Sequence, residues 1–92
     1  MTTVRIPPVL RAAAGNQKQV DVPGGTVASV IDSLLAAHPG LREQLLTPEG
    51  DLNRFVNVYL NDQDIRYLQA LETPVGERDS VIILPAMAGG GD

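Results

Sequence analysis

The residues with the clearest chemical potential are the last eight, 85–92, which read PAMAGGGD. They directly follow the apolar run VIIL at 81–84, which is typical of a β-strand. Because glycine has no Cβ, a tail of this composition can enter a channel that is too narrow for other residues. Glycine-rich ends are also common as plain linkers, so the tail alone leaves both interpretations open.

Other side chains that could do chemistry form no recognisable site. The single histidine, His38, precedes a proline at the predicted end of a helix, where it suits the helix dipole better than catalysis. The carboxylates are spread along the chain, as expected of solvated or turn residues, without an acid–base pair or a metal set. Gly24 and Gly25 lack the motif of a phosphate-binding loop. We therefore predict no catalytic residue and no metal ligand.

Composition excludes several classes of function. Cysteine is absent, which rules out a disulfide scaffold, a thiolate metal site and a catalytic or persulfide-carrying thiol. The 92 residues, 43% of them apolar, suffice for one small domain but not for an internal cofactor cavity. The seven lysines and arginines form no cluster in the sequence and aromatic residues are scarce, so we predict no nucleic-acid partner. The net charge of −4 favours a basic partner surface. The start of the chain has no long apolar run, which predicts a cytoplasmic location without contact with a membrane.

Two alternating runs near the start predict an antiparallel hairpin. Residues 3–10 are expected to form a half-buried strand with Val4 and Ile6 inward, and the prolines at 7–8 to lie at a bend or on an unpaired side. Residues 11–17 predict a turn, and 18–22 predict the returning strand.

One helix follows the hairpin. Thr26 is a suitable N-cap, and the HPG sequence at 38–40 is a suitable end. Between them, apolar residues recur at helical spacing and predict one buried stripe: Val27, Val30, Ile31, Leu34 and Leu35. Residues 41–46 are expected to add a short helical turn. A helix with one apolar stripe implies one sheet for it to cover.

The second half of the chain predicts two main strands. Alternation over 55–60 places its even-numbered apolar residues inward and Phe55 and Tyr59 outward. In the last strand, Ile82 and Leu84 are expected to point outward. Between these strands we expect, in order, a turn, a short strand and a plain connection: 61–62, 64–66 and 68–77.

The order strand, strand, helix, strand, short strand, strand is that of the ubiquitin-like β-grasp. It predicts an α+β fold with a mixed sheet of four to five strands and one main helix across one face. The first and last strands should lie parallel, side by side. Residues 1–85 are expected to form this domain, and 86–92 a flexible glycine-rich tail.

Four stretches of the chain carry a family resemblance: IPPVLR at 6–11, RFVNVYLN at 54–61, DIR at 64–66 and DSVIILPAMAGG at 79–90. With them, the chain resembles the ubiquitin-like sulfur carriers, the family that includes ThiS, MoaD and CysO, and within it the CysO type most. The resemblance covers nearly the whole chain, so it is more specific than a pair of glycines.

The resemblance implies a reaction cycle at the C-terminus. An E1-like enzyme of the MoeB or ThiF type would use ATP to adenylate the last glycine, because a free carboxylate is a poor electrophile. A sulfur donor would then displace AMP and leave a thiocarboxylate. In CysO-like systems a PLP-dependent cysteine synthase takes up this sulfur. The resemblance therefore implies a co-substrate that binds no cofactor, and not an enzyme.

The chain departs from the family pattern at Gly91 and Asp92, because the mature tail of the family ends in Gly-Gly. Asp92 would bring a Cβ and a second carboxylate into a channel shaped for glycine. We therefore expect a precursor that is trimmed by a zinc metalloprotease of the JAMM type. Gly90, preceded by Gly89, would become the reactive residue, or Gly91 would if only Asp92 is removed. The alternative is that the last residues are not native to the protein.

The outward face of the predicted sheet has no helix to cover it, and such faces commonly dock partners. The predicted docking residues lie on this face and in the tail: Arg5, Phe55, Tyr59, Ile82, Leu84 and Met87. Two alternatives are open. The apolar residues are ordinary scattered surface residues, or the connection over 68–77 folds across part of them.

Three other functions stay open. The same sulfur chemistry could serve another client, as in the small subunit of molybdopterin synthase or in carriers for thiazole, tRNA thiolation or a secondary metabolite. The activated glycine could instead join lysines of other proteins, as in a ubiquitin-like modifier. The domain could also be a binding module with an inert tail.

Overall fold

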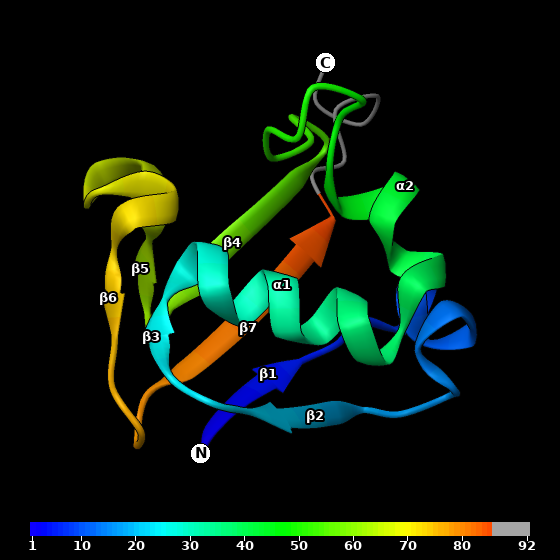
Figure 1. Ribbon diagram of the computed structural model, residues 1–92, viewed down its shortest axis with the longest axis horizontal. Helices are drawn as coiled ribbons and strands as arrows, with labels where there is room; N and C mark the ends of the chain where they lie inside the picture. Colours follow the sequence, from blue (N-terminus) through cyan, green and yellow to red (C-terminus); the bar gives the residue numbers. More distant parts are fainter. Residues whose placement is uncertain (86–92) are drawn as a thin grey trace.

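The computed structural model of the chain describes residues 1–85. Its centre is a five-stranded mixed sheet with the order β2-β1-β7-β4-β5 (Figure 1). The strands are β1 (Thr2–Arg5), β2 (Gln19–Val22), β4 (Val56–Leu60), β5 (Gln63–Asp64) and β7 (Ser80–Pro85). β7 runs parallel to β1 and antiparallel to β4, so the last strand lies in the middle of the sheet beside the first. This is the predicted α+β, β-grasp arrangement.

The first strand is shorter than predicted. β1 ends at Arg5, and Pro8–Ala14 form a 3-10 helix, η1, where we expected the strand to continue to residue 10. The two prolines are the reason. Pro7 is extended, with φ −69° and ψ 156°, and Pro8 takes the first helical position, where its missing N–H is not needed. The antiparallel pairing of β1 with β2 is confirmed, but the predicted turn over 11–17 contains the second half of η1.

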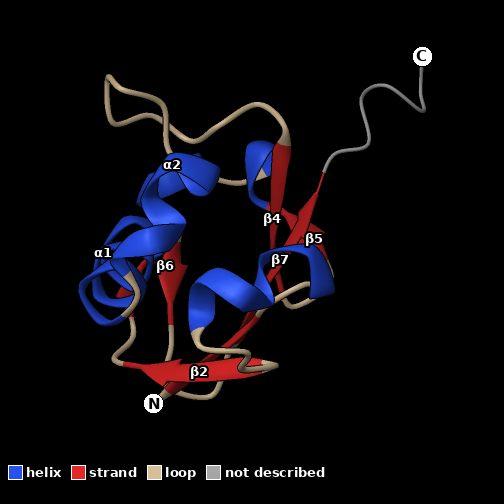
Figure 2. Cartoon of the chain, turned by 90° about the vertical axis from the view of Figure 1, so that its right-hand side faces the viewer, coloured by secondary structure: helices blue, strands red, loops and turns tan. Residues whose placement is uncertain are grey.

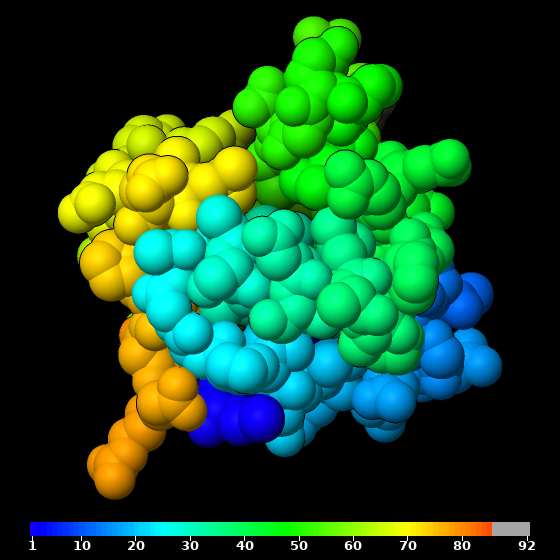
Figure 3. Space-filling model, viewed as in Figure 1, coloured from blue at the N-terminus to red at the C-terminus, as the bar shows by residue number. Residues whose placement is uncertain are grey.

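One α-helix crosses the sheet. α1 (Val27–Ala37) begins at a capping box, in which the Thr26 hydroxyl accepts the Ser29 N–H and the Ser29 hydroxyl oxygen accepts the Thr26 N–H. All five residues of the predicted stripe are buried in the core: Val27, Val30, Ile31, Leu34 and Leu35. Figure 2 shows α1 on one side of the sheet. In Figure 3, the cyan and green atoms of α1 and of the segments that follow it hide most of the sheet. The predicted short helical turn is present as two elements: η2 (Pro39–Leu41) and α2 (Arg42–Leu45).

A second sheet of two short strands involves the segment that we expected to be a plain connection. β3 (Gly25–Thr26) pairs with β6 (Pro74–Val75), and the segment before β6 contains two 3-10 helices: η3 (Ile65–Tyr67) and η4 (Ala70–Glu72). The Val27 N–H donates to the Thr73 carbonyl at 3.0 Å and holds this segment at the start of α1. The segment therefore packs with the helix.

Asp64 is a polar exception at the edge of an aliphatic core. The residue is 9% exposed, although we expected all carboxylates to be solvated or in turns, and the strand predicted over 64–66 ends at Asp64. The Asp64 carboxylate accepts the backbone N–H of Arg66 at 2.9 Å and its Nη2 at 2.7 Å. The hydrogen bond from the Arg66 side chain lowers the pKa of Asp64, so this nearly buried carboxylate stays charged.

Candidate functional site

The strand register gathers three predicted docking residues into one row across the sheet. Arg5 of β1 pairs with Ile82 of β7, and Ile82 pairs on its other side with Tyr59 of β4. Paired residues of neighbouring strands point to the same face. Val81 and Ile83 alternate with Ile82 and are buried in the core, so the row lies on the face away from α1.

The next outward position along β7 is Leu84. Leu84 is 42% exposed, Arg5 is exposed, and Ile82 and Tyr59 are half-buried. The term "outer face" is used below for these four residues. In the connection, η4 and β6 contact α1, and β6 pairs with β3, so this part of the segment lies with the helix and not on the outer face.

Phe55 lies outside the strand in which we predicted it. β4 begins at Val56, and Phe55 occupies the preceding turn, where its N–H donates to Asn53 Oδ1 at 2.9 Å. The residue is 51% exposed, and the guanidinium carbon of Arg54 lies 5.4 Å from the centre of its ring. Because Val56 pairs with Pro85, Phe55 lies beside the point at which the chain leaves β7. Its docking role stays a prediction, at the start of the tail instead of within β4.

The reactive end that the sequence predicts begins at this point. β7 ends at Pro85, and four predicted site residues lie outside the described residues: Met87, Gly89, Gly90 and Gly91. Their roles stay predictions. The structure defines where the tail starts, because β7 is paired with β1 on one edge and with β4 on the other.

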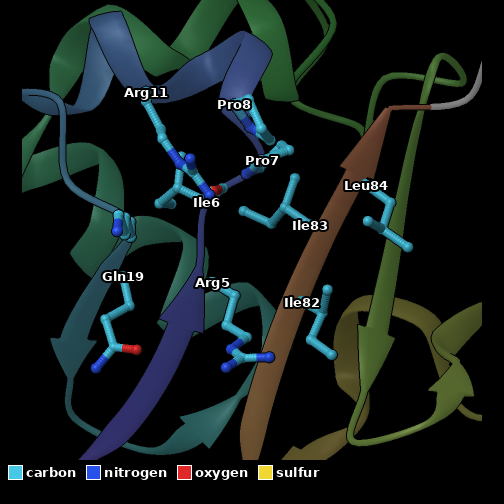
Figure 4. Close-up of a pocket in the computed structure, with 10 residues that line it drawn as sticks. Arg5, Ile6, Pro7, Pro8, Arg11, Gln19, Ile82, Ile83 and Leu84 are labelled. Atoms are coloured by element: carbon cyan, nitrogen blue, oxygen red, sulfur yellow. The ribbon is translucent and has the colours of Figure 1, made fainter.

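A hollow of about 420 Å³ opens beside the outer face, between β1, β7 and η1 (Figure 4). Its walls include two arginines and a lysine: Arg5, Arg11 and Lys18. The Nε–H of Arg11 donates to the Ile6 carbonyl at 3.0 Å, and the Ile6 N–H donates to the Lys18 carbonyl at 2.9 Å. Arg11 and Lys18 were not predicted as site residues from the sequence. No local period relates them to Arg5, and only closure of the hairpin brings the three together. This hollow is called the basic hollow below.

The described part of the chain offers no competing centre. Within residues 1–85, no group of three His, Cys, Asp or Glu side chains is arranged to hold a metal ion. The backbone N–H of His38 donates to the Leu34 carbonyl at 2.8 Å and caps the end of α1. Over the same residues, no helix is long and apolar enough to cross a membrane. The candidate site therefore consists of the outer face, Phe55, the basic hollow and the start of the tail.

Comparison with protein families accounts for nearly the whole chain. A model described as the ThiS family matches residues 4–90. The chain belongs to the ThiS family of ubiquitin-like sulfur carriers. The match ends at Gly90, so Gly91 and Asp92 lie beyond it. Membership confirms the resemblance seen in the sequence and the sulfur-carrier function that it implied.

Named relatives of this ThiS-family chain include carriers and modifiers. The sulfur carrier protein CysO of Mycobacterium tuberculosis is 48% identical over 90 residues, which cover 96% of this chain and 97% of CysO. The small archaeal modifier protein 3 of Haloferax volcanii is 34% identical over 65 residues, which cover 71% of this chain and 70% of that protein.

Solved structures agree with the sequence relatives. The crystal structure of Mycobacterium tuberculosis CysO matches with a TM-score of 0.87 and 45% identity, covering 95% of this chain and 100% of CysO. A chain of the Amycolatopsis orientalis BexX/CysO complex matches with a TM-score of 0.89 and 43% identity, covering 98% of this chain and 100% of that one. The second structure contains a partner protein, as expected of a carrier that acts by binding other proteins.

Proposed function

We propose that this ThiS-family carrier bears its sulfur as a thiocarboxylate on Gly90, after Gly91 and Asp92 have been removed. The observation that carries the proposal is the family match, which runs to Gly90 and no further. The 48% identity to CysO along nearly the whole chain supports it. A zinc metalloprotease of the JAMM type is the class of enzyme that we expect to remove the two residues. Gly91 becomes the reactive end if only Asp92 is removed.

The proposed chemistry at Gly90 takes two steps. In the first, a carboxylate oxygen bonds to the α-phosphorus of ATP and pyrophosphate leaves, which converts a poor electrophile into an acyl adenylate. In the second, a sulfur nucleophile attacks the carbonyl carbon and AMP leaves with its electron pair, so that a C–S bond replaces the C–O bond. An E1-like enzyme of the MoeB or ThiF type holds the ATP. The carrier is thus a co-substrate that binds no cofactor and contributes no catalytic residue.

The outer face, with Phe55 beside it, is the surface that we propose for contact with the activating enzyme. Its central residue, Ile82, is three residues from Pro85, where the described chain ends. An enzyme bound to the outer face would therefore lie at a short and constant distance from Pro85, where the tail starts. Met87 would extend this contact into the tail.

Cysteine biosynthesis is the client pathway that we propose, with a PLP-dependent cysteine synthase as sulfur acceptor in the cytoplasm. The support is the 48% identity to CysO over 96% of this chain and the structural match to CysO at 45% identity and a TM-score of 0.87. The likeness to the putative molybdopterin converting factor subunit of Pyrococcus furiosus, at 17% identity, extends to the fold alone.

A second candidate function is a ubiquitin-like modifier of other proteins. The 34% identity to small archaeal modifier protein 3 favours it. The two functions share the acyl adenylate and differ in the nucleophile, which is sulfur in one case and a lysine amine in the other. Isopeptide-linked adducts on lysines of a cell lysate would support the modifier.

Intact-mass spectrometry tests the proposed function. Chains that end at Gly90, Gly91 and Asp92 are incubated with the activating enzyme, ATP and sulfide, and parallel samples without ATP serve as controls. We expect only the chain ending at Gly90 to gain the mass difference between sulfur and oxygen. An equal gain by the chain ending at Asp92 would show that trimming is not required. The carrier proposal fails if none of the three chains gains it.

A further inference from the structure

The basic hollow reverses the charge of the chain locally. The chain has 11 acidic residues against seven basic ones, yet Arg5, Arg11 and Lys18, three of the seven, line this one hollow. None of its lining residues is acidic. The overall charge favours a basic partner surface, but this part of the surface fits an acidic one.

The three cationic side chains are available to a partner. Within residues 1–85, the two ion pairs are Met1 with Glu77 and Arg66 with Asp64, and neither involves the hollow. The Arg11 Nε–H donates to the Ile6 carbonyl, and this hydrogen bond orients the guanidinium. Its two NH₂ groups make no hydrogen bond within the described part of the chain. A guanidinium held in this way is preorganised to bind a carboxylate, since less side-chain entropy is lost on binding.

The rest of the hollow is lined mainly by apolar residues. Ile82 and Leu84 of the outer face line it together with Pro7 and Pro8, and Figure 4 shows Arg5 between Gln19 and Ile82. The hollow is therefore continuous with the outer face and shares residues with it. A segment that carries a carboxylate next to an aliphatic side chain complements both the cationic and the apolar residues of this lining.

The position of the hollow places it within reach of whichever enzyme holds the tail. Four residues, 86–89, separate Pro85 from Gly90, the glycine that is proposed to react, and the five Cα–Cα steps between them span at most about 17 Å. Leu84, at the rim of the hollow, is the residue before Pro85. Since a specific interface covers about 800 Å² on each partner, an enzyme bound around the start of the tail has an interface large enough to include the hollow.

We propose that the basic hollow receives an acidic segment of the activating enzyme, with a glutamate or aspartate carboxylate between Arg11 and Lys18. The inference rests on the proposed function and adds the chemistry of the partner surface. The activating enzyme is the occupant because it must bind every carrier molecule, whichever client takes the sulfur. Opposite charges at this position would also accelerate association of the carrier with its enzyme.

The first test compares two variants of equal net charge. The double variant Arg11→Gln/Lys18→Gln removes two charges from the hollow, and Arg42→Gln/Arg78→Gln removes two from exposed positions outside it. In kcat/KM for ATP-dependent thiocarboxylate formation, we expect the hollow variant to fall about tenfold, mainly through KM, and the control by less than about twofold. The deficit should shrink when salt is raised. Equal losses in both variants, or no loss in either, would overturn the proposal.

Lys18→Gln alone keeps this test valid if the loss of the Arg11 hydrogen bond disturbs folding. The Lys18 side chain is exposed and makes no side-chain hydrogen bond within residues 1–85. Far-UV circular dichroism and thermal unfolding are measured on every variant. A loss of kcat/KM that follows the loss of folded protein would count against the proposal.

The second test does not depend on sulfur chemistry. The ¹⁵N-labelled chain ending at Gly90 is titrated with acetyl-LEELE-amide and, as a control, with acetyl-LQQLQ-amide, and amide shifts are recorded. We expect shifts concentrated at residues 5–6, 9–11 and 18–19 with the acidic peptide only, and their loss in Arg11→Gln/Lys18→Gln. Shifts scattered over the chain, or equal with both peptides, would overturn the proposal even if the carrier function holds.

The same spectra distinguish a second occupant, the carboxylates of Asp92. Spectra of the chains ending at Asp92 and at Gly90 are compared without peptide. If removal of Gly91 and Asp92 shifts the amides of residues 5–6, 9–11 and 18–19, the hollow binds the chain's own end and the assignment to a partner is wrong. Identical spectra over these residues support the partner.

Discussion

Replacing Asp64 by alanine should lower the free energy of unfolding by about 1–2 kcal/mol. Asp64 is the N-cap of η3, where its carboxylate accepts the Arg66 N–H at 2.9 Å, and loss of such a cap costs about 0.5–2 kcal/mol. The charged pair adds less than its 2.7 Å distance suggests, because the Arg66 side chain is 62% exposed and is screened by water. In a domain of this size, the expected loss corresponds to a fall of about 5–10 °C in Tm.

Urea unfolding of three variants separates the cap from the charge. Asp64→Asn keeps a side-chain oxygen that can cap η3 and loses only the charge, so it should cost less than half as much as Asp64→Ala. Asp62→Ala, at an exposed position in the preceding turn, is the matched control and should lie within about 0.5 kcal/mol of the wild type. If Asp64→Ala also lies within that margin at pH 7, the capping argument is wrong.

The pH dependence follows from the pKa of Asp64, which the Arg66 side-chain hydrogen bond lowers in the folded state. The folded chain then binds fewer protons at this site than the unfolded chain. The stabilisation is therefore present above the unfolded value of about 3.9 and is lost as pH falls through the folded value. Wild type and Asp64→Asn should converge in stability near pH 2. A gap that stays constant from neutral pH to about pH 2 would refute the electrostatic part.

Three further predictions concern strain, capping and docking. Ala70 has φ +52°, a left-handed conformation in which glycine has no steric penalty, so Ala70→Gly should stabilise the fold by about 0.5 kcal/mol in urea unfolding; a lower midpoint would contradict this. Thr26→Ala removes the N-cap of α1 and should cost about 1 kcal/mol, and an unchanged Tm would count against the capping box. Phe55→Ala should weaken binding to the activating enzyme about tenfold in surface plasmon resonance, whereas Tyr67→Ala, at an 86% exposed aromatic in η3, should change it by less than about twofold. Equal effects of these two substitutions would remove the docking role of Phe55.

The sequence predicts those elements that are long enough for the spacing of their apolar residues to indicate which side is buried. The stripe of α1 extends over 27–35 and the alternation of β4 over 56–60, and in both the residues predicted to be inward are buried, except Leu60, which is half-buried. β3 and β6 have two residues each, which is too short for any period. The prolines at 7–8 suggest a bend and equally suit the start of a helix, which is what they form.

The candidate site also has one part that the sequence predicts and another that it does not. The outer face was predictable because β7 alternates, and because parallel pairing of the first and last strands places Arg5 beside Ile82. The basic hollow was not, since Arg11 and Lys18 come together only when η1 and the hairpin have formed. The burial of Asp64 likewise depends on packing at the end of β5, which no local pattern reports.

The placement of β7 connects the proposed docking surface with the proposed reactive end. β7 is the middle strand of five and is paired on both edges, so its backbone is held by β1 and β4. Along it, Val81 and Ile83 anchor the strand in the core, while Ile82 and Leu84 face outward. A partner that binds these two outward residues therefore contacts the strand that continues into the tail. Covalent geometry then sets an upper limit on the distance from this surface to the glycine proposed to react, so a single enzyme surface could recognise the domain and receive the tail in one binding event.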